Sequence, residues 1–238
     1  MHPLIRTARV TGLLYLGVAI AGGLGFLLIR PQFFVTDDAN ATLAGLVEHE
    51  SLARVGVALE LLLVLTQALT AVWFYRLFRT VDSVAAGSIA VFGMANAVAI
   101  LGSAALLATA IEVALTPVGD AAATVQLMYL ISGNLWTVGA LFFGLWLIPM
   151  GWCVLRSGWM PRILGWLLVG GGVGYVLSPL VGYLAPGAGV VADVLTVPAS
   201  VGEFWMIGYL LVRGIRVRAL PGTPRDTTVS PLPAQSRA

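Results

Sequence analysis

Residues 141–175 read LFFGLWLIPMGWCVLRSGWMPRILGWLLVGGGVGY, and the expected fold and orientation of the chain follow from this segment. Two apolar runs flank a short basic break that contains Arg156 and Arg162. Apolar runs of this length cross a bilayer as helices, and so short a break makes them an antiparallel hairpin. Because arginine stays on the cytoplasmic side of membrane proteins, the turn of this hairpin sets the expected orientation of every other segment.

Composition places the whole chain in a membrane. Of its 238 residues, 59% are hydrophobic and 10% are charged, whereas soluble domains carry about 25% charged residues. In lipid only helices or a closed barrel satisfy every backbone polar group, and a barrel is made of alternating strands of about ten residues. The long apolar runs do not alternate. The sequence therefore predicts an all-α integral membrane bundle.

Six transmembrane spans are expected after an N-terminal segment at 1–9, with the ranges 10–29, 52–78, 84–111, 123–155, 163–183 and 190–212. Pro149 predicts a tilt or kink near the end of the fourth span. Residues 213–238 are rich in proline, serine, threonine and arginine, which predicts a disordered tail.

A short extracytoplasmic surface helix is expected between the first two spans. Asp38 or Asn40 can cap this helix at its N-terminus. Its apolar residues Leu43, Leu46 and Val47 share one face at helical spacing.

The first apolar run has two interpretations. The sequence Ala19-Ile20-Ala21 resembles the small-residue cleavage site of a secretory signal peptide. The apolar run continues to Ile29, however, which is too long for an ordinary signal core. A retained transmembrane helix is therefore favoured.

Six spans put both termini on one side of the membrane, and arginine decides which side. Only Arg30 and Arg54 lie on the opposite side, whereas the shared side has Arg6, Arg9, Arg76, Arg79, Arg156, Arg162 and the five arginines of the tail. The positive-inside rule predicts cytoplasmic N- and C-termini. The expected location is the bacterial plasma membrane.

Glu203 is the first candidate site residue, because it lies far inside the sixth span. It stands roughly 20 Å along this helix at 1.5 Å per residue, where an unpaired carboxylate is costly. Asp193, Thr196 and Ser200 precede it at spacings of 3, 4 and 3 residues, which places all four on one helix face. A polar stripe is therefore expected from the outer mouth to mid-bilayer.

A second stripe follows the second span, where Glu60, Gln67 and Thr70 share a face below Arg54. Two asparagines lie at comparable depth in the next spans, Asn96 and Asn134. These residues have two interpretations. They line an outward-facing polar cavity, or they hydrogen-bond to one another as interhelical contacts.

Small residues form stripes for close helix packing, at Gly17-xxx-Ala21-xxx-Gly25 and at Gly170-xxx-Gly174. The glycine-rich run 170–174 does not predict a phosphate loop, because no strand precedes it and no Lys-Ser or Lys-Thr follows.

The spans lack the histidines and paired cysteines that most haem, metal and hydrolase sites require. Cys153 is the only cysteine, and the two histidines, His2 and His49, lie outside the spans. A bis-histidine haem, a histidine-based metal site and a serine-histidine hydrolase are therefore not expected. The net charge of +2 does not indicate nucleic-acid binding. We expect no cofactor and no metal.

Five segments resemble the landmarks of a known family. They are RSGWMPRILG at 156–165, RTARVTGLLY at 6–15, SLARVG at 51–56, Gly202-Glu203 and LLVRG at 210–214. In these segments the chain is similar to the bacterial multi-pass membrane family known as domain of unknown function 4386. This resemblance implies a six-helix prokaryotic membrane protein and brings no activity with it. It includes Arg54 and Glu203 among the family landmarks.

Three functional hypotheses follow. The first is a membrane protein that binds or transports a small amphipathic or lipid-like ligand in the outward-facing cavity. The second is an intramembrane enzyme that uses Glu203 and Glu60 on a lipid. The third is a structural or sensory protein whose polar stripe packs against a partner. The expected partners are the lipid bilayer, a small-molecule or lipid ligand, and a second copy of the chain.

Overall fold

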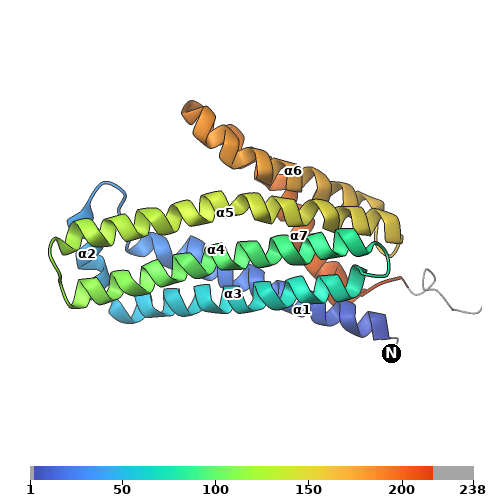
Figure 1. Ribbon diagram of the computed structural model, residues 1–238, viewed down its shortest axis with the longest axis horizontal. Coiled ribbons are helices and arrows are strands. Elements are labelled where there is room, and N and C mark those ends of the chain that lie inside the picture. The colour runs from blue at the N-terminus through green and yellow to red at the C-terminus, as the bar shows by residue number, and fades with distance from the viewer. Residues whose placement is uncertain (1–2, 217–238) are drawn as a thin grey trace, which may run out of the picture.

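The computed structural model describes residues 3–216, which are helical and contain no strand. The long helices are α1 (Pro3–Gly22), extended by η1 (Gly23–Ile29) and η2 (Arg30–Gln32), then α3 (Glu50–Phe78), α4 (Ser83–Leu115), α5 (Ala121–Ser157), α6 (Arg162–Leu184) and α7 (Gly189–Val212). Each is long and apolar enough to cross a membrane (Figure 1). The predicted fold class, an all-α multi-pass membrane bundle, is confirmed.

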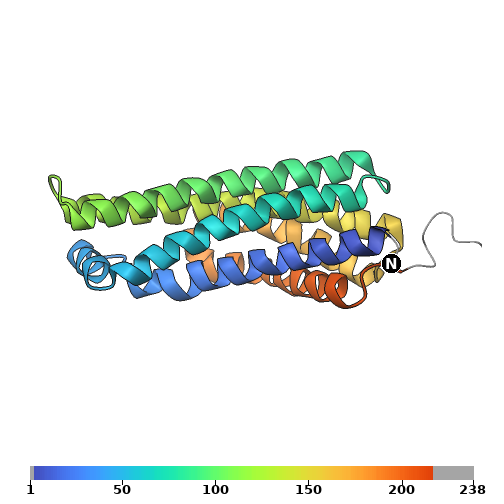
Figure 2. The same cartoon turned by 90° about the horizontal axis from the view of Figure 1, so that it is seen from below.

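The six long helices pack as a ring. α1 contacts α3 and α7, α4 contacts α3 and α5, and α6 contacts α5 and α7. Figure 2 shows α1 and α7 beside one another, which closes the ring between the first and last helices. The interior of this ring holds both the core and the candidate site.

Helix ends differ from the expected ranges by several residues at some positions. α1 begins at Pro3 rather than residue 10, and α4 continues to Leu115 rather than ending at 111. α5 runs through Pro149 as one helix. The expected disordered tail lies outside the described residues, apart from its first four positions.

Residues 141–175 form the predicted hairpin of α5 and α6. α5 ends at Ser157 and is capped by Gly158, whose φ of 65° is left-handed, a conformation that glycine adopts without steric cost. Pro161 then precedes the first residue of α6. A left-handed cap followed by proline stops one helix and starts the next within a few residues.

The short helix expected between the first two spans is α2 (Ala39–Glu48). The Asp38 side chain caps it by accepting a hydrogen bond from the backbone N–H of Ala41 at 2.9 Å. Leu46 is buried against the bundle, whereas Val47 is 50% exposed, so the expected apolar face is only partly covered by the other helices. The helix packs on the ends of α4 and α5 opposite the N-terminus.

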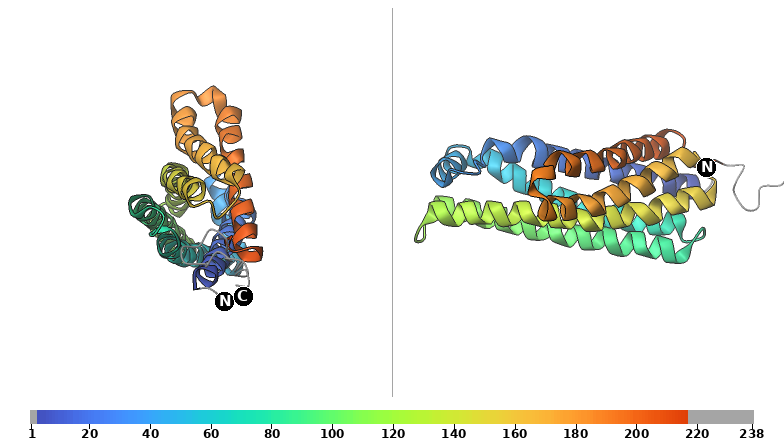
Figure 3. Two further views of the ribbon diagram at one scale, coloured as in Figure 1. Left: turned by 90° about the vertical axis from the view of Figure 1, so that its right-hand side faces the viewer. Right: turned by 90° about the horizontal axis from the view of Figure 1, so that it is seen from above.

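The hairpin of α6 and α7 is shorter than the other helices and diverges from them. Its turn, η3 (Pro186–Ala188), stops short of the end of the bundle that carries α2, and it extends away from the other helices (Figures 1 and 3). Within the hairpin, a side chain at Gly174 would collide with the backbone carbonyl of Leu195. The backbones of α6 and α7 are therefore in direct contact at Gly174.

The glycine stripe expected at Gly170-xxx-Gly174 is half right. Gly174 contacts α7, but no atom lies within 4 Å of a side chain added at Gly170. Gly171 takes its place, facing Ala199 of α7. The glycine that packs against α7 at the start of this stripe is therefore one residue later than expected.

Candidate functional site

A cavity of about 550 Å³ lies inside the ring of helices. All six long helices contribute to it, and most of its lining is apolar or aromatic. Its polar lining residues are Tyr15, Gln67, Asn96, Trp136, Thr137, Tyr175, Ser178, Asp193, Ser200 and Glu203. This volume falls within the range of about 300–1,000 Å³ that is typical of small-molecule sites.

Tyr15 and Glu203 meet in the wall of the cavity. The phenol of Tyr15 donates a hydrogen bond to Oε1 of Glu203, which joins α1 to α7. The Tyr15 ring makes edge-to-face contacts with Phe74 and Trp146, at centroid distances of 5.4 and 5.5 Å. These buried rings hold the Tyr15 hydroxyl in place. Glu203 is therefore a positioned carboxylate within the membrane.

Gln67 lines the same cavity and carries an unsatisfied amide, both of whose polar atoms are shielded from solvent. Its side chain is 0% exposed, yet neither Nε2 nor Oε1 has a hydrogen-bond partner among the described residues. An unpaired buried amide costs about 1–3 kcal/mol. A bound molecule with a donor and an acceptor would satisfy both atoms once the buried side chain turns toward it.

The cavity opens between η1 and α7. Leu27 of η1 and Phe204 of α7 line it and are 68% and 67% exposed. Asp193 lines it as well and is exposed near the turn between α6 and α7. The opening therefore has apolar edges and one carboxylate.

A second polar cluster lies behind the cavity and centres on Glu60. Ser103 donates to Oε2 of Glu60 at 2.8 Å, and the Trp136 indole donates to Oε1 at 3.2 Å. Glu60 is 3% exposed, so both of its oxygens have partners inside the protein. Trp136 separates the two sites, because it lines the cavity and contacts Glu60 at once.

The Glu60 cluster continues to Arg30 through a second serine. The hydroxyls of Ser103 and Ser132 lie 2.7 Å apart, and Arg30 donates to Ser132 at 2.8 Å. Arg30 also donates to the backbone carbonyl of Tyr129 at 2.6 Å. A continuous hydrogen-bond chain thus links the guanidinium to the carboxylate across α5 and α4.

The structure brings five of the eight predicted site residues to the cavity: Gln67, Asn96, Asp193, Ser200 and Glu203. The other three lie elsewhere. Glu60 belongs to the cluster behind Trp136, and Arg54 is exposed and pairs with Glu50 at 2.7 Å. Asn134 accepts a hydrogen bond from Tyr183 at 3.2 Å.

The sequence interpretation missed the partners of both glutamates. Tyr15 binds Glu203, and Ser103, Ser132 and Trp136 form the environment of Glu60. One signal was available, because Ser103 follows Asn96 by seven residues and lies on the same face of α4. Tyr15 and Trp136 carry no such signal, since aromatic residues are common in membrane helices.

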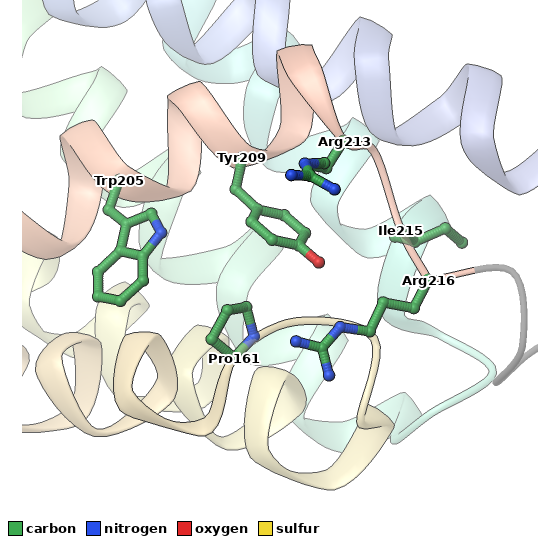
Figure 4. A pocket seen from close by; sticks show the side chains of 6 residues that line it. All are labelled: Pro161, Trp205, Tyr209, Arg213, Ile215 and Arg216. Carbon is green, nitrogen blue, oxygen red and sulfur yellow. The ribbon is translucent and has the colours of Figure 1, made fainter.

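A second hollow lies at the end of the bundle where the N-terminus is found. It has a volume of about 530 Å³ and is lined by Pro161, Trp205, Tyr209, Arg213, Ile215 and Arg216. Figure 4 shows Trp205, Tyr209 and Arg213 along α7, with Arg216 on the chain beyond it. This hollow is basic, whereas the charged residues of the central cavity are acidic.

Comparison with known proteins gives one family match. The family described as "Domain of unknown function (DUF4386)" matches residues 10–214. A protein of Archaeoglobus fulgidus, named "Uncharacterized protein", is 31% identical over 87 residues, or 37% of this chain. That alignment covers 51% of the relative, so the chain spans about half of its length. No solved structure matches.

Proposed function

The chain belongs to the DUF4386 family, and we propose that it binds or transports a small amphipathic or lipid-like molecule in the central cavity. This proposal begins from the cavity rather than from the family, which brings no activity with it. It makes Glu203 the central polar anchor, with Gln67 beside it in the lining and Ser200 and Asp193 leading toward the opening.

One observation carries the proposal: the unpartnered amide of Gln67 in the wall of the cavity. Buried polar groups in membrane helices normally pair with one another, and Gln67 does not. A protein that only needed interhelical contacts would gain stability by replacing this residue with an apolar one. A ligand in the cavity would supply hydrogen-bond partners for the amide once the buried side chain turns toward it.

The shape of the opening supports an amphipathic ligand. Leu27 and Phe204 place apolar, exposed surface at the edge, facing where lipid chains would lie. Polar groups such as Glu203 lie deeper. A molecule with an apolar body and a polar head would therefore enter sideways from the bilayer and leave its head group against the carboxylate.

The geometry favours binding over the two-glutamate enzyme. Such an enzyme needs Glu60 and Glu203 in reach of one substrate. Glu60 does not line the cavity, and its oxygens are occupied by Ser103 and Trp136. The partner hypothesis is also less favoured, because the polar stripe of α7 faces the ring interior at Ser200 and Glu203.

Orientation follows from the arginines. Arg6, Arg76, Arg156 and Arg213 lie on the helix ends at the N-terminal end of the bundle, whereas Arg30 lies toward the other end. We place the first end in the cytoplasm of a prokaryotic cell, with the bundle in the plasma membrane. Asp193 and the cavity opening then face the outer half of the bilayer.

Native mass spectrometry of the protein released from its membranes tests the proposal. We expect a discrete mass bound to the wild type that is lost in Glu203→Gln and retained in Glu112→Gln. Glu112 is the matched control because it is an exposed carboxylate on α4 that does not line the cavity. A wild-type protein without bound mass, or a mass that Glu203→Gln leaves in place, would contradict the proposal.

A further inference from the structure

We infer that the ligand of the central cavity is an amphipathic cation: a protonated amine attached to an apolar or aromatic body. This inference rests on the proposed function and names the chemical class of its ligand. Three independent properties of the lining carry it, namely its charge, its aromatic content and its unpartnered amide.

The lining contains acidic side chains and no basic ones among the described residues. Asp193 and Glu203 are its charged residues, and no arginine, lysine or histidine lines the described cavity. Within the described residues Glu203 accepts a hydrogen bond from Tyr15 and forms no ion pair. A carboxylate in an apolar medium strongly favours a positive partner. A cationic head group supplies the missing counter-charge.

Arg30 does not serve as this counter-charge. Its guanidinium donates to Ser132 and to the Tyr129 carbonyl, in the cluster behind Trp136. That cluster already pairs one acidic side chain, Glu60, with one basic side chain through two hydroxyls. The protein thus balances one of its two membrane glutamates internally and leaves the other facing the cavity.

The aromatic lining fits a cation with an apolar body. Six aromatic side chains line the cavity: Tyr15, Phe26, Trp136, Phe143, Tyr175 and Phe204. The faces of such rings attract cations and also bury apolar surface. Phe26 and Trp136 stack at 4.4 Å, and the Arg30 guanidinium lies 5.4 Å from the centroid of the Phe26 ring. Phe26 therefore already has a cationic neighbour, and the other rings of the lining are the ones that a ligand would meet.

Gln67 narrows the class to amines that carry N–H groups. Its Oε1 is an unpartnered acceptor in a side chain that lines the cavity, and an ammonium N–H would donate to this oxygen once the buried side chain turns toward the ligand. A quaternary ammonium has no proton to donate, so it would leave this acceptor unpaired. Primary and secondary amines are therefore expected to bind more tightly than their quaternary counterparts.

Three probes with one apolar body and different head groups test the inference. 4-Phenylbutylamine is cationic, 4-phenylbutanol is neutral and 4-phenylbutyrate is anionic. Their affinities are measured by calorimetry on the full chain in phosphatidylcholine nanodiscs, with empty nanodiscs subtracted. We expect the amine to bind at least about tenfold more tightly than the alcohol, and the anion to bind least. Equal affinity for amine and alcohol, or preference for the anion, would overturn the inference and leave the proposed function standing.

Substitutions in the lining test whether the preference for the amine over the alcohol arises in the cavity. Glu203→Gln should reduce amine affinity about tenfold and leave alcohol affinity unchanged, while Glu112→Gln should alter neither. If Glu203→Gln fails to fold, Asp193→Asn provides the second variant, since Asp193 is exposed at the opening. Unchanged amine affinity in the folded variants would refute the inference.

A second measurement uses the rate of cysteine modification instead of the binding of phenylbutyl compounds. The variant Ser200→Cys should react faster with a cationic than with an anionic methanethiosulfonate reagent, and adding Glu203→Gln should remove the difference in rate. Cys153 is fully buried, which keeps the background low. Faster reaction with the anionic reagent would overturn the inference. A wild type that binds no probe and carries no co-purified mass would instead overturn the proposed function.

Discussion

The Tyr15 phenol donates a hydrogen bond to Oε1 of Glu203, and this contact joins the first and last membrane helices of the ring. Both residues line the central cavity, so the bond closes the helix ring and positions the carboxylate that faces the proposed ligand. Structure and proposed function therefore depend on the same pair.

Tyr15→Phe isolates the hydrogen bond from the packing. Phenylalanine keeps the edge-to-face contacts with Phe74 and Trp146 but leaves Glu203 without its donor. We expect the free energy of unfolding to fall by about 1–3 kcal/mol, measured by denaturant unfolding in detergent micelles. Tyr183→Phe is the control, because the Tyr183 hydroxyl bonds to Asn134 on the exposed surface. Equal losses in the two variants would show that the Tyr15 bond has no special weight.

The serine pair between Glu60 and Arg30 should behave as one unit. Ser103→Ala removes a donor to Glu60 and Ser132→Ala removes an acceptor of Arg30. Each change should cost about 1–3 kcal/mol, and the double variant should cost less than the sum, because both break the same chain. Unfolding of the four proteins measures the coupling. Ser88→Ala, on the exposed face of α4, should change stability by less than about 0.5 kcal/mol. Strict additivity would mean that the chain is not coupled.

The architecture was predictable because hydropathy and arginine placement are local properties. Each span is a long run of mainly apolar residues, and the hairpin at Arg156 and Arg162 can be predicted from its own residues. The stripe that includes Ser200 and Glu203 was predictable for the same reason, since helical spacing places residues of one helix on one face. Both residues line the cavity.

The partners of those residues were not predictable, because they come from other helices. Arg54 lies six residues before Glu60 in the sequence, yet it pairs with Glu50 on the surface. The basic residue joined to Glu60 is Arg30, from the far end of the first span, through Ser132 and Ser103. Helix rotation decides such pairings. One residue of rotation also separates Gly171, which faces Ala199, from Gly170, beside which the described part of the chain has no atom within 4 Å.

The closest approach of α6 and α7 predicts a sharp contrast between two glycines. A methyl group at Gly174 would meet the backbone carbonyl of Leu195, whereas no atom lies within 4 Å of one at Gly170. Backbone cannot move aside easily, so Gly174→Ala should destabilise the protein by about 1–3 kcal/mol. Gly170→Ala should be neutral or stabilise it by up to about 1 kcal/mol, through helix propensity. Thermal unfolding of both variants measures this, and similar melting temperatures would contradict the close contact.

Asp82 lies between α3 and α4 and contacts the last turns of α5 at the N-terminal end of the bundle. We expect its contribution to stability to depend on pH in the acidic range. Asp82 accepts hydrogen bonds from the backbone N–H groups of Val84 and Ala85, and its other oxygen accepts from Trp152 and pairs with Arg156 at 3.1 Å. The hydrogen bond from the Ala85 N–H and that from the Trp152 indole, with the charge of Arg156, hold the pKa of this carboxyl below its ordinary value. The lowered pKa belongs to the folded state, so the contribution is complete above the unfolded-state pKa of about 3.9. It is lost as the pH falls through the lower pKa of the folded state.

The variant Asp82→Asn tests this dependence, because asparagine still caps the helix but cannot carry the charge. We expect the wild type to melt at a higher temperature than Asp82→Asn at pH 6. The difference should shrink as the pH falls below about 3.9, since the wild-type carboxyl then becomes neutral as well. Asp120→Asn is the matched control: Asp120 caps α5 through the Ala123 N–H and has no ion pair among the described residues. A difference for Asp82→Asn that persists unchanged at low pH would show that shape, rather than charge, gives Asp82 its effect.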